Sequence, residues 1–150
     1  MDEKELIEKE TIYREKERIE KIMAKRIWDV GAHLTTECKT FKKSKKDKVL
    51  IDDKNITIKF DYPLERPALK NFSNENGFTL AELLRSIYKG YAEIYKEEEV
   101  FEKAKMIKNS YNRNKTNGPW GIWGHVIGDL YVEAVYYDAK KKLITLSMGS

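Results

Sequence analysis

The residues best suited to chemistry lie in and around one glycine-rich stretch, NGPWGIWGH. His125 carries an imidazole that can act as an acid or base near neutral pH, and Asp129 follows it closely. With Arg113 upstream, these side chains could line the pocket of an enzyme, and Cys38 could serve as a nucleophile. Nothing in their spacing requires them to meet. We therefore assign no catalytic residue, and an enzyme using His125 and Asp129 is the third hypothesis for this chain.

The glycines of this stretch do not match a nucleotide-binding loop. Gly118, Gly121 and Gly124 recur every three residues, and no lysine followed by a hydroxyl residue completes a phosphate loop. A dinucleotide fingerprint needs a βαβ unit, which the order of elements does not provide. His33 and His125 lie far apart in the chain and make a weak case for a metal site. The sequence therefore predicts no cofactor and no bound metal.

A structural turn explains these residues better. Gly118 can take a positive φ and Pro119 fixes φ, so the pair predicts a tight turn. Trp120 and Trp123 can then lie against the bare backbone of the glycines, and His125 can hydrogen-bond backbone groups through both ring nitrogens. The alternative is an exposed aromatic site for a protein partner. Its candidate residues are Trp120, Trp123, His125, Asp129 and Arg113.

The composition limits the class of protein. A chain of 150 residues suits one domain with an appended arm, and 36% charged residues indicate a solvated helix or tail. No apolar run approaches the ~20 residues that span a bilayer, so we expect no membrane partner. The charged start, MDEKELIEKE, is not typical of a secretory signal. The single cysteine excludes an internal disulfide and favours an intracellular, reducing compartment.

A lysine-rich segment is the strongest charge feature. Between residues 39 and 48, six lysines face one acid, Asp47. Such a run is usually a solvated loop, but it can also bind nucleic-acid phosphates with a steep salt dependence. Non-specific nucleic-acid binding, extended by residues 140–142, is therefore the second hypothesis. Its candidate residues are Lys39, Lys42, Lys43, Lys45, Lys46 and Lys48.

Two helices are predicted. Residues 3–28 form the first, because good helix formers run without Gly or Pro and opposite charges recur at i,i+4 spacing. Its apolar stripe is thin and irregular, so this helix either packs lightly on its own domain or reaches for a partner. The second helix begins at Thr79, which forms a capping box with Glu82, and carries a wide apolar face. Gly90 inside it predicts a close neighbour against the helix backbone.

Two hairpins are predicted. Residues 48–52 and 55–60 are expected to pair across a DDKN turn, and residues 62–77 to be irregular because of two prolines. Residues 129–150 form the second hairpin, with Leu130, Val132, Ala134 and Tyr136 on one face.

These elements predict an α+β fold. An antiparallel sheet of two hairpins would pack on one long amphipathic helix, with an appended charged N-terminal helix. The expected organisation is a charged helical extension at 1–38, a lysine-rich loop at 39–48 and a single α+β domain at 49–150.

The C-terminal part carries a resemblance. The segments NRNKTNGPWGIWGHVIGDLYVEAVYYD, GFTLAELLRSIYKGYAEIYKEEE and DYPLERPA resemble a family of small uncharacterised proteins from giant DNA viruses, plants and protists, which share an NRxxTxGxYGIWGHxIxDL signature. The likeness covers Phe60 to Ser150. This chain departs at Trp120, where the family often has tyrosine, and at Ala134, where it often has glycine. The matching positions include Asn112, Arg113, Thr116, Gly118, Gly121, Ile122, Trp123, Gly124, His125, Asp129 and Leu130.

The resemblance implies a grouping and a viral source, but no reaction. We therefore expect a non-enzymatic interaction or structural protein, associated with the virion or the host of a large DNA virus. Its location would be the cytoplasm or nucleus of the host cell, or the virion. A protein partner or self-association is the expected mode of action, with nucleic acid as the alternative partner.

Overall fold

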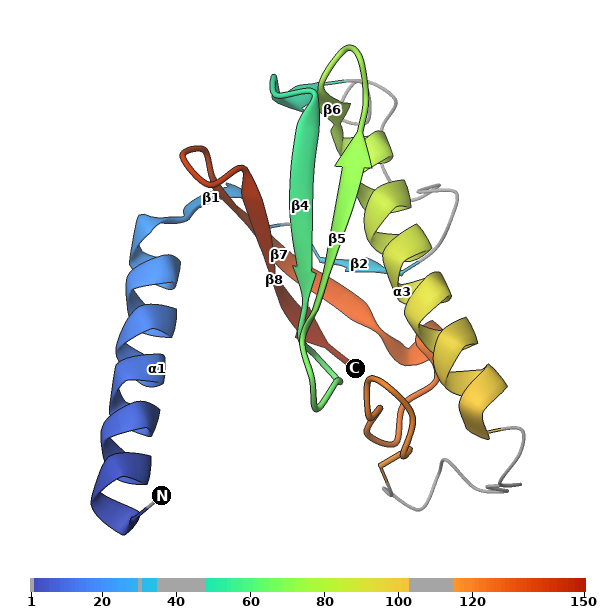
Figure 1. The fold of residues 1–150 in the computed structure, drawn as a ribbon. Coiled ribbons are helices and arrows are strands. Elements are labelled where there is room, and N and C mark those ends of the chain that lie inside the picture. The colour runs from blue at the N-terminus through green and yellow to red at the C-terminus, as the bar shows by residue number, and fades with distance from the viewer. Residues whose placement is uncertain (1, 30, 35–47, 103–114) are drawn as a thin grey trace.

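A central sheet and one long helix organise the structure, a computed structural model that describes residues 2–29, 31–34, 48–102 and 115–150 (Figure 1). Within the first helix, side chains are described for residues 3–16 and 18. The elements in chain order are α1 (Glu3–Met23), β1 (Lys25–Trp28), β2 (Ala32–His33), β3 (Val49–Ile51), β4 (Asn55–Phe60), β5 (Ala68–Ser73), β6 (Phe78–Thr79), α3 (Leu80–Glu102), the 3₁₀ helix η2 (Ile127–Asp129), β7 (Tyr131–Asp138) and β8 (Leu143–Gly149).

The main sheet has six strands. Five follow the order β1-β7-β8-β4-β5, and the sixth, β2, pairs with β7, as β1 does. The hairpins β4–β5 and β7–β8 are antiparallel. Strand β8 joins them by pairing in parallel with β4. The predicted α+β fold is confirmed, with the difference that the joint between the two hairpins is parallel.

The core lies between the sheet and α3. Strand β4 alternates, so that Ile56, Ile58 and Phe60 are buried on the face toward the helix. The apolar stripe of α3, which includes Ile87 and Tyr91, meets them in one hydrophobic cluster. Burying each such side chain contributes about 1.5–3 kcal/mol. In Figure 1, α3 runs along one side of the sheet and α1 stands on the opposite side.

The start of α3 is fixed by its own sequence and by a short strand pair. Glu82 N donates to Thr79 Oγ1 at 3.2 Å, and Thr79 N donates to Glu82 Oε1 at 3.4 Å. These two bonds confirm the predicted capping box. Strand β6 pairs with β3, and Leu80 N donates to the Lys48 carbonyl at 3.3 Å, which anchors the first turn of the helix.

The predicted pairing of residues 48–52 with 55–60 is wrong. Strand β4 pairs with β5, which lies in the segment predicted to be irregular. The signal of β5 was hidden because an inward-facing position is Lys70, whose ammonium reaches Glu93 and Glu97 of α3 at 3.1 and 3.4 Å. Both prolines precede the strand. Strand β5 lies at the edge of the sheet, where neighbouring prolines are tolerated.

The first helix is shorter than predicted. It ends at Met23, and residues 25–28 instead form β1, paired with β7 in the main sheet. Strand β2 also pairs with β7. Ile27 and Trp28 pack against the core, and this burial outweighs the helical continuation that the local composition favours.

The second predicted hairpin is confirmed, but the set of positions that face the core changes part-way along β7. A register shift between Val132 and Ala134 moves the inward positions by one residue. Val135 and Tyr137 therefore join the core, and Tyr136, predicted to face inward, is only half-buried.

The close neighbour predicted at Gly90 is the ring of Phe60. A Cβ atom at this position would overlap the ring, which is fully buried and has no room to move. We expect Gly90→Ala to lower the free energy of unfolding by about 1–2 kcal/mol, because overpacking outweighs the gain in helix propensity. Urea denaturation measures the change.

Gly128→Ala is the control, since a Cβ atom there meets nothing within 4 Å. A Gly90→Ala protein as stable as the parent would contradict this account of the helix–sheet contact.

Candidate functional site

The glycine-rich stretch is held by a buried carboxylate. Glu98, near the end of α3, is only 2% exposed. Its oxygens accept hydrogen bonds from the backbone N–H groups of Gly118, Trp120 and Gly121 at 3.1, 3.1 and 3.0 Å, and from the Thr116 hydroxyl. A buried charge is stable only when it is met by donors in this way. The stretch is therefore wrapped around one side chain of the long helix.

Two of the three glycines in this stretch, Gly118 and Gly121, have separate structural reasons. A side chain at Gly118 would overlap the Glu98 carboxylate. The positive φ predicted for Gly118 belongs instead to Gly121, at +66°. Glycine adopts this left-handed conformation without strain, so the turn can reverse and present consecutive N–H groups to Glu98.

The segment before β5 clamps the turn from the other side. The Arg66 guanidinium donates to the carbonyls of Gly118 and Pro119 at 2.5 and 2.6 Å. Lys115 Nζ lies 2.5 Å from a Glu65 carboxylate oxygen, and this hydrogen bond lowers the pKa of Glu65. The backbone N–H groups of the turn therefore donate to Glu98 on one side, and its carbonyl groups accept from Arg66 on the other.

His125 lies at the edge of this turn. Its Nε2 is 3.2 Å from the Tyr62 hydroxyl, which in turn lies 2.8 Å from Ser150 Oγ. The expectation that both ring nitrogens bond backbone groups is therefore wrong. The backbone carbonyl of His125 accepts a hydrogen bond from the Tyr95 hydroxyl at 2.9 Å. Burial raises the pKa of Tyr95 above its usual range, so this hydroxyl remains a donor.

A shallow hollow of about 320 Å³ opens beside His125. It is lined by Asp61, Tyr62, Pro63, Leu64, Trp123 and His125. Trp123 is 49% exposed, so the structure leaves this ring on the surface while Trp120 packs against the core. The Trp120 indole N–H donates to Glu97 at 2.8 Å. Of the two tryptophans in this stretch, Trp123 is the one whose ring lies at the surface.

The structure does not assemble a catalytic set from the described residues. The Asp129 carboxylate accepts from Val126 N at 3.3 Å and closes η2, which occupies it in a turn rather than directing it to His125. Arg113 and Cys38 lie outside the described residues. His33 packs against Tyr131 in a T-shaped ring contact. Within the described ranges, no three His, Cys, Asp or Glu side chains are grouped to hold a metal.

The lysine-rich segment is described only at its end. Lys48 is exposed beside β1 and the β7–β8 turn, where Lys140 also lies. Lys39, Lys42, Lys43, Lys45 and Lys46 lie outside the described residues.

Helix α1 makes the third surface feature. Every described side chain from Asp2 to Lys16, together with Arg18, is exposed. Leu6, Ile7, Ile12 and Tyr13 are apolar or aromatic and are 53–57% exposed. No helix in the part of the chain that the structure describes is long and apolar enough to cross a membrane.

The sequence reasoning missed Glu98. It lies in line with the buried stripe of α3, four residues after Ile94 and seven after Tyr91. An acid at a core position of an otherwise apolar stripe signals a buried partner, and this pattern could have identified it.

Comparison with known protein families, with curated proteins and with solved structures finds no match to this chain. The resemblance to the giant-virus, plant and protist family therefore remains a prediction.

Glu98→Gln tests the anchor. The amide would point an N–H group at backbone donors that now bind a carboxylate oxygen, leaving at least one of them unsatisfied. We expect the free energy of unfolding to fall by about 2–3 kcal/mol, measured by urea denaturation.

Glu99→Gln, the same change at the next, exposed position, should leave stability within about 0.5 kcal/mol. Equal effects of the two substitutions would show that Glu98 does not anchor the turn.

Proposed function

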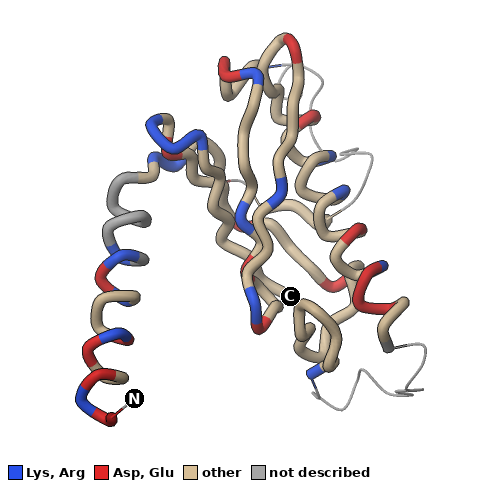
Figure 2. The backbone as a smooth tube through the Cα atoms, viewed as in Figure 1, with Lys and Arg blue, Asp and Glu red and all other residues tan. Residues whose placement is uncertain are grey.

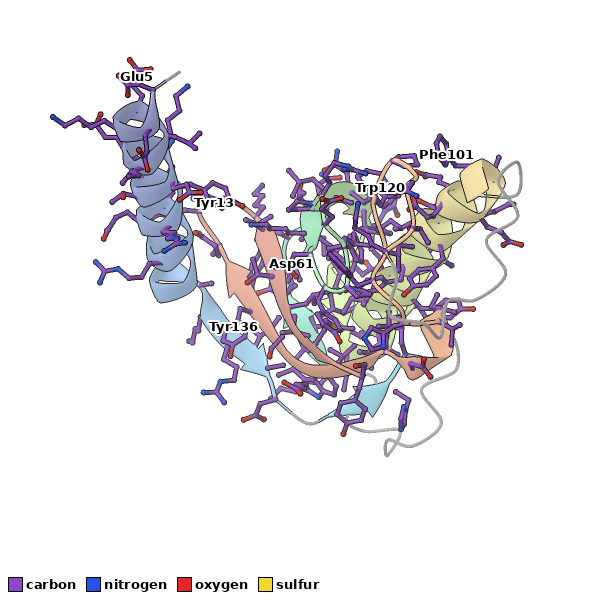
Figure 3. All side chains as sticks on the ribbon, turned by 90° about the horizontal axis from the view of Figure 1, so that it is seen from below. Glu5, Tyr13, Asp61, Phe101, Trp120 and Tyr136 are labelled. Carbon is purple, nitrogen blue, oxygen red and sulfur yellow. The ribbon has the colours of Figure 1, made fainter. Side chains whose placement is uncertain are left out.

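We propose that this protein is a non-enzymatic interaction protein that self-associates through helix α1. The observation that carries this proposal is the exposure of the helix. A helix of 21 residues whose described side chains are all exposed contributes little to the core of its own domain. Figure 3 shows it standing beside the sheet, with Glu5 near its free end and side chains radiating around it.

The charge distribution favours a second copy as the partner. Within α1, residues 3–10 contain four acids and two lysines, whereas residues 11–23 contain four basic residues and three acids. The first part of the helix is thus negative and the second part weakly positive. Two copies in antiparallel orientation place opposite charges side by side at both ends, and a two-fold axis makes each contact twice.

One register satisfies this pattern. When two antiparallel helices are centred on Tyr13, the middle residue of α1, Glu10 of one helix lies opposite Lys16 of the other. Both positions lie within about 60° of Tyr13 around the helix, so they flank the same face. Tyr13 and Leu6, seven residues apart, lie on one face and supply apolar contact.

The other features of the molecule agree with a role without catalysis. The side chains of the glycine-rich stretch that could take part in catalysis are largely engaged in holding the turn. Trp123, in contrast, offers a surface contact. The setting we propose, the virion or host cell of a large DNA virus, is supported only by the resemblance of residues 60–150.

A charge-swap experiment tests the pairing. Glu10→Lys should make one repulsive variant, and Lys16→Glu should make another. We expect each alone to dimerise at least about threefold more weakly than the parent, because two exposed pairs worth about 0.2–1 kcal/mol each change sign. Sedimentation equilibrium measures the association.

Mixing the two variants should restore a heterodimer. The lysine introduced at position 10 of one chain then faces the glutamate introduced at position 16 of the other, and the unchanged Lys16 and Glu10 pair at the opposite end. Circular dichroism checks that α1 stays helical. A parent protein that is monomeric at every concentration, or a mixture that fails to associate, would overturn the proposal.

A further inference from the structure

A basic groove lies where β1, β3 and the β7–β8 turn meet. Its volume is about 540 Å³, and its lining includes four cationic residues: Lys25, Arg26, Lys48 and Lys140. They come from three separate parts of the chain. Figure 2 shows the blue positions gathered at the tip of the β7–β8 hairpin, beside the end of α1. The tertiary structure thus creates a cluster that no single segment contains.

Among the described residues that line the groove, the one acid has its carboxylate engaged within the fold. Asp138 is 7% exposed, and its carboxylate accepts the backbone N–H groups of Lys140 and Lys141 at 3.0 and 3.2 Å. Arg26 pairs with Asp29 at 3.5 Å, but both side chains are more than half exposed, so this pair is easily exchanged. The groove therefore presents net positive charge to a ligand.

The floor of the groove is apolar. Ile27, Val49 and Leu50 line it together with Tyr137, whose hydroxyl donates to Asp53 and is held inside the fold. A positive rim around an apolar floor suits a ligand with phosphates along its edge and flat, weakly polar groups facing inward. Unstacked bases have this character, whereas the outside of a duplex offers phosphates alone.

We propose that this groove binds single-stranded nucleic acid through its phosphate backbone, with bases against the apolar floor. The chain supports this assignment on both sides of the groove. In the sequence, five further lysines lie between residues 39 and 46 before Lys48, and Lys141 and Lys142 follow Lys140. The proposal does not depend on self-association through α1, which uses a different surface.

Fluorescence anisotropy of a labelled oligothymidine of about 15 nucleotides tests the groove. The variant carries Lys25→Gln, Arg26→Gln and Lys140→Gln, and titrations run at about 50 and about 200 mM salt. We expect the affinity at the lower salt to fall at least tenfold. The slope of log affinity against log salt should fall by about 2, because three phosphate contacts are lost.

The matched control carries Arg85→Gln, Lys89→Gln and Lys96→Gln, which remove the same charge from exposed positions of α3. It should bind almost as the parent does. Lys25→Arg with Lys140→Arg keeps the charge and should also keep binding, with circular dichroism confirming the fold of each variant.

Four results would overturn the proposal: no binding by the parent at the lower salt, an equal loss in the α3 control, tighter binding of a duplex of the same length, or equal competition by polyglutamate at the same charge. The last would identify the groove as a site for acidic protein instead.

Discussion

A buried carboxylate needs hydrogen-bond donors, and the part of the molecule around the end of α3 is arranged to supply them to Glu98. Three backbone N–H groups and one hydroxyl converge on it from a stretch of six residues. The glycine at position 118 and the positive φ at Gly121 follow from the need to bring these donors together. Because the acid lies on α3, the turn is fixed to the same helix that covers the sheet.

Tyrosines extend this anchoring to the neighbouring segments. The hydroxyls of Tyr91 and Tyr95 donate to the carbonyls of Tyr62 and His125 at 2.6 and 2.9 Å. Burial raises the pKa of both hydroxyls, so neither loses its proton near neutral pH. The result is one end of the domain in which α3, the segment after β4 and the glycine-rich turn are tied together by satisfied hydrogen bonds.

The opposite end has a different character. There the described side chains of α1 are exposed, and cations from β1, the start of β3 and the β7–β8 turn surround a groove. Exposed charge adds little to stability, so these residues are not explained by the fold itself. The proposed functions therefore use the charged surface, whereas Asp129 and, in the glycine-rich stretch, Trp120 form hydrogen bonds within the fold.

Local sequence determined the elements whose signals are local. The capping box of Thr79 and Glu82, the apolar stripe of α3, the need for glycine at position 90 and the C-terminal hairpin all follow from spacing and side-chain type. The α+β class follows from their combination. In each case the information lies within a few residues, where helix and strand periods act.

The tertiary structure decided which strands pair, where α1 ends and what holds the glycine-rich stretch. Strand β5 was hidden because the lysine facing inward finds its acids on α3, and residues 25–28 leave the helix because β7 offers them a partner. Glu98 and the groove cations are distant in sequence from the residues they act with. Such contacts depend on chain segments that meet only after folding, so a local pattern can mark Glu98 as a buried acid but cannot identify the groups that bind it.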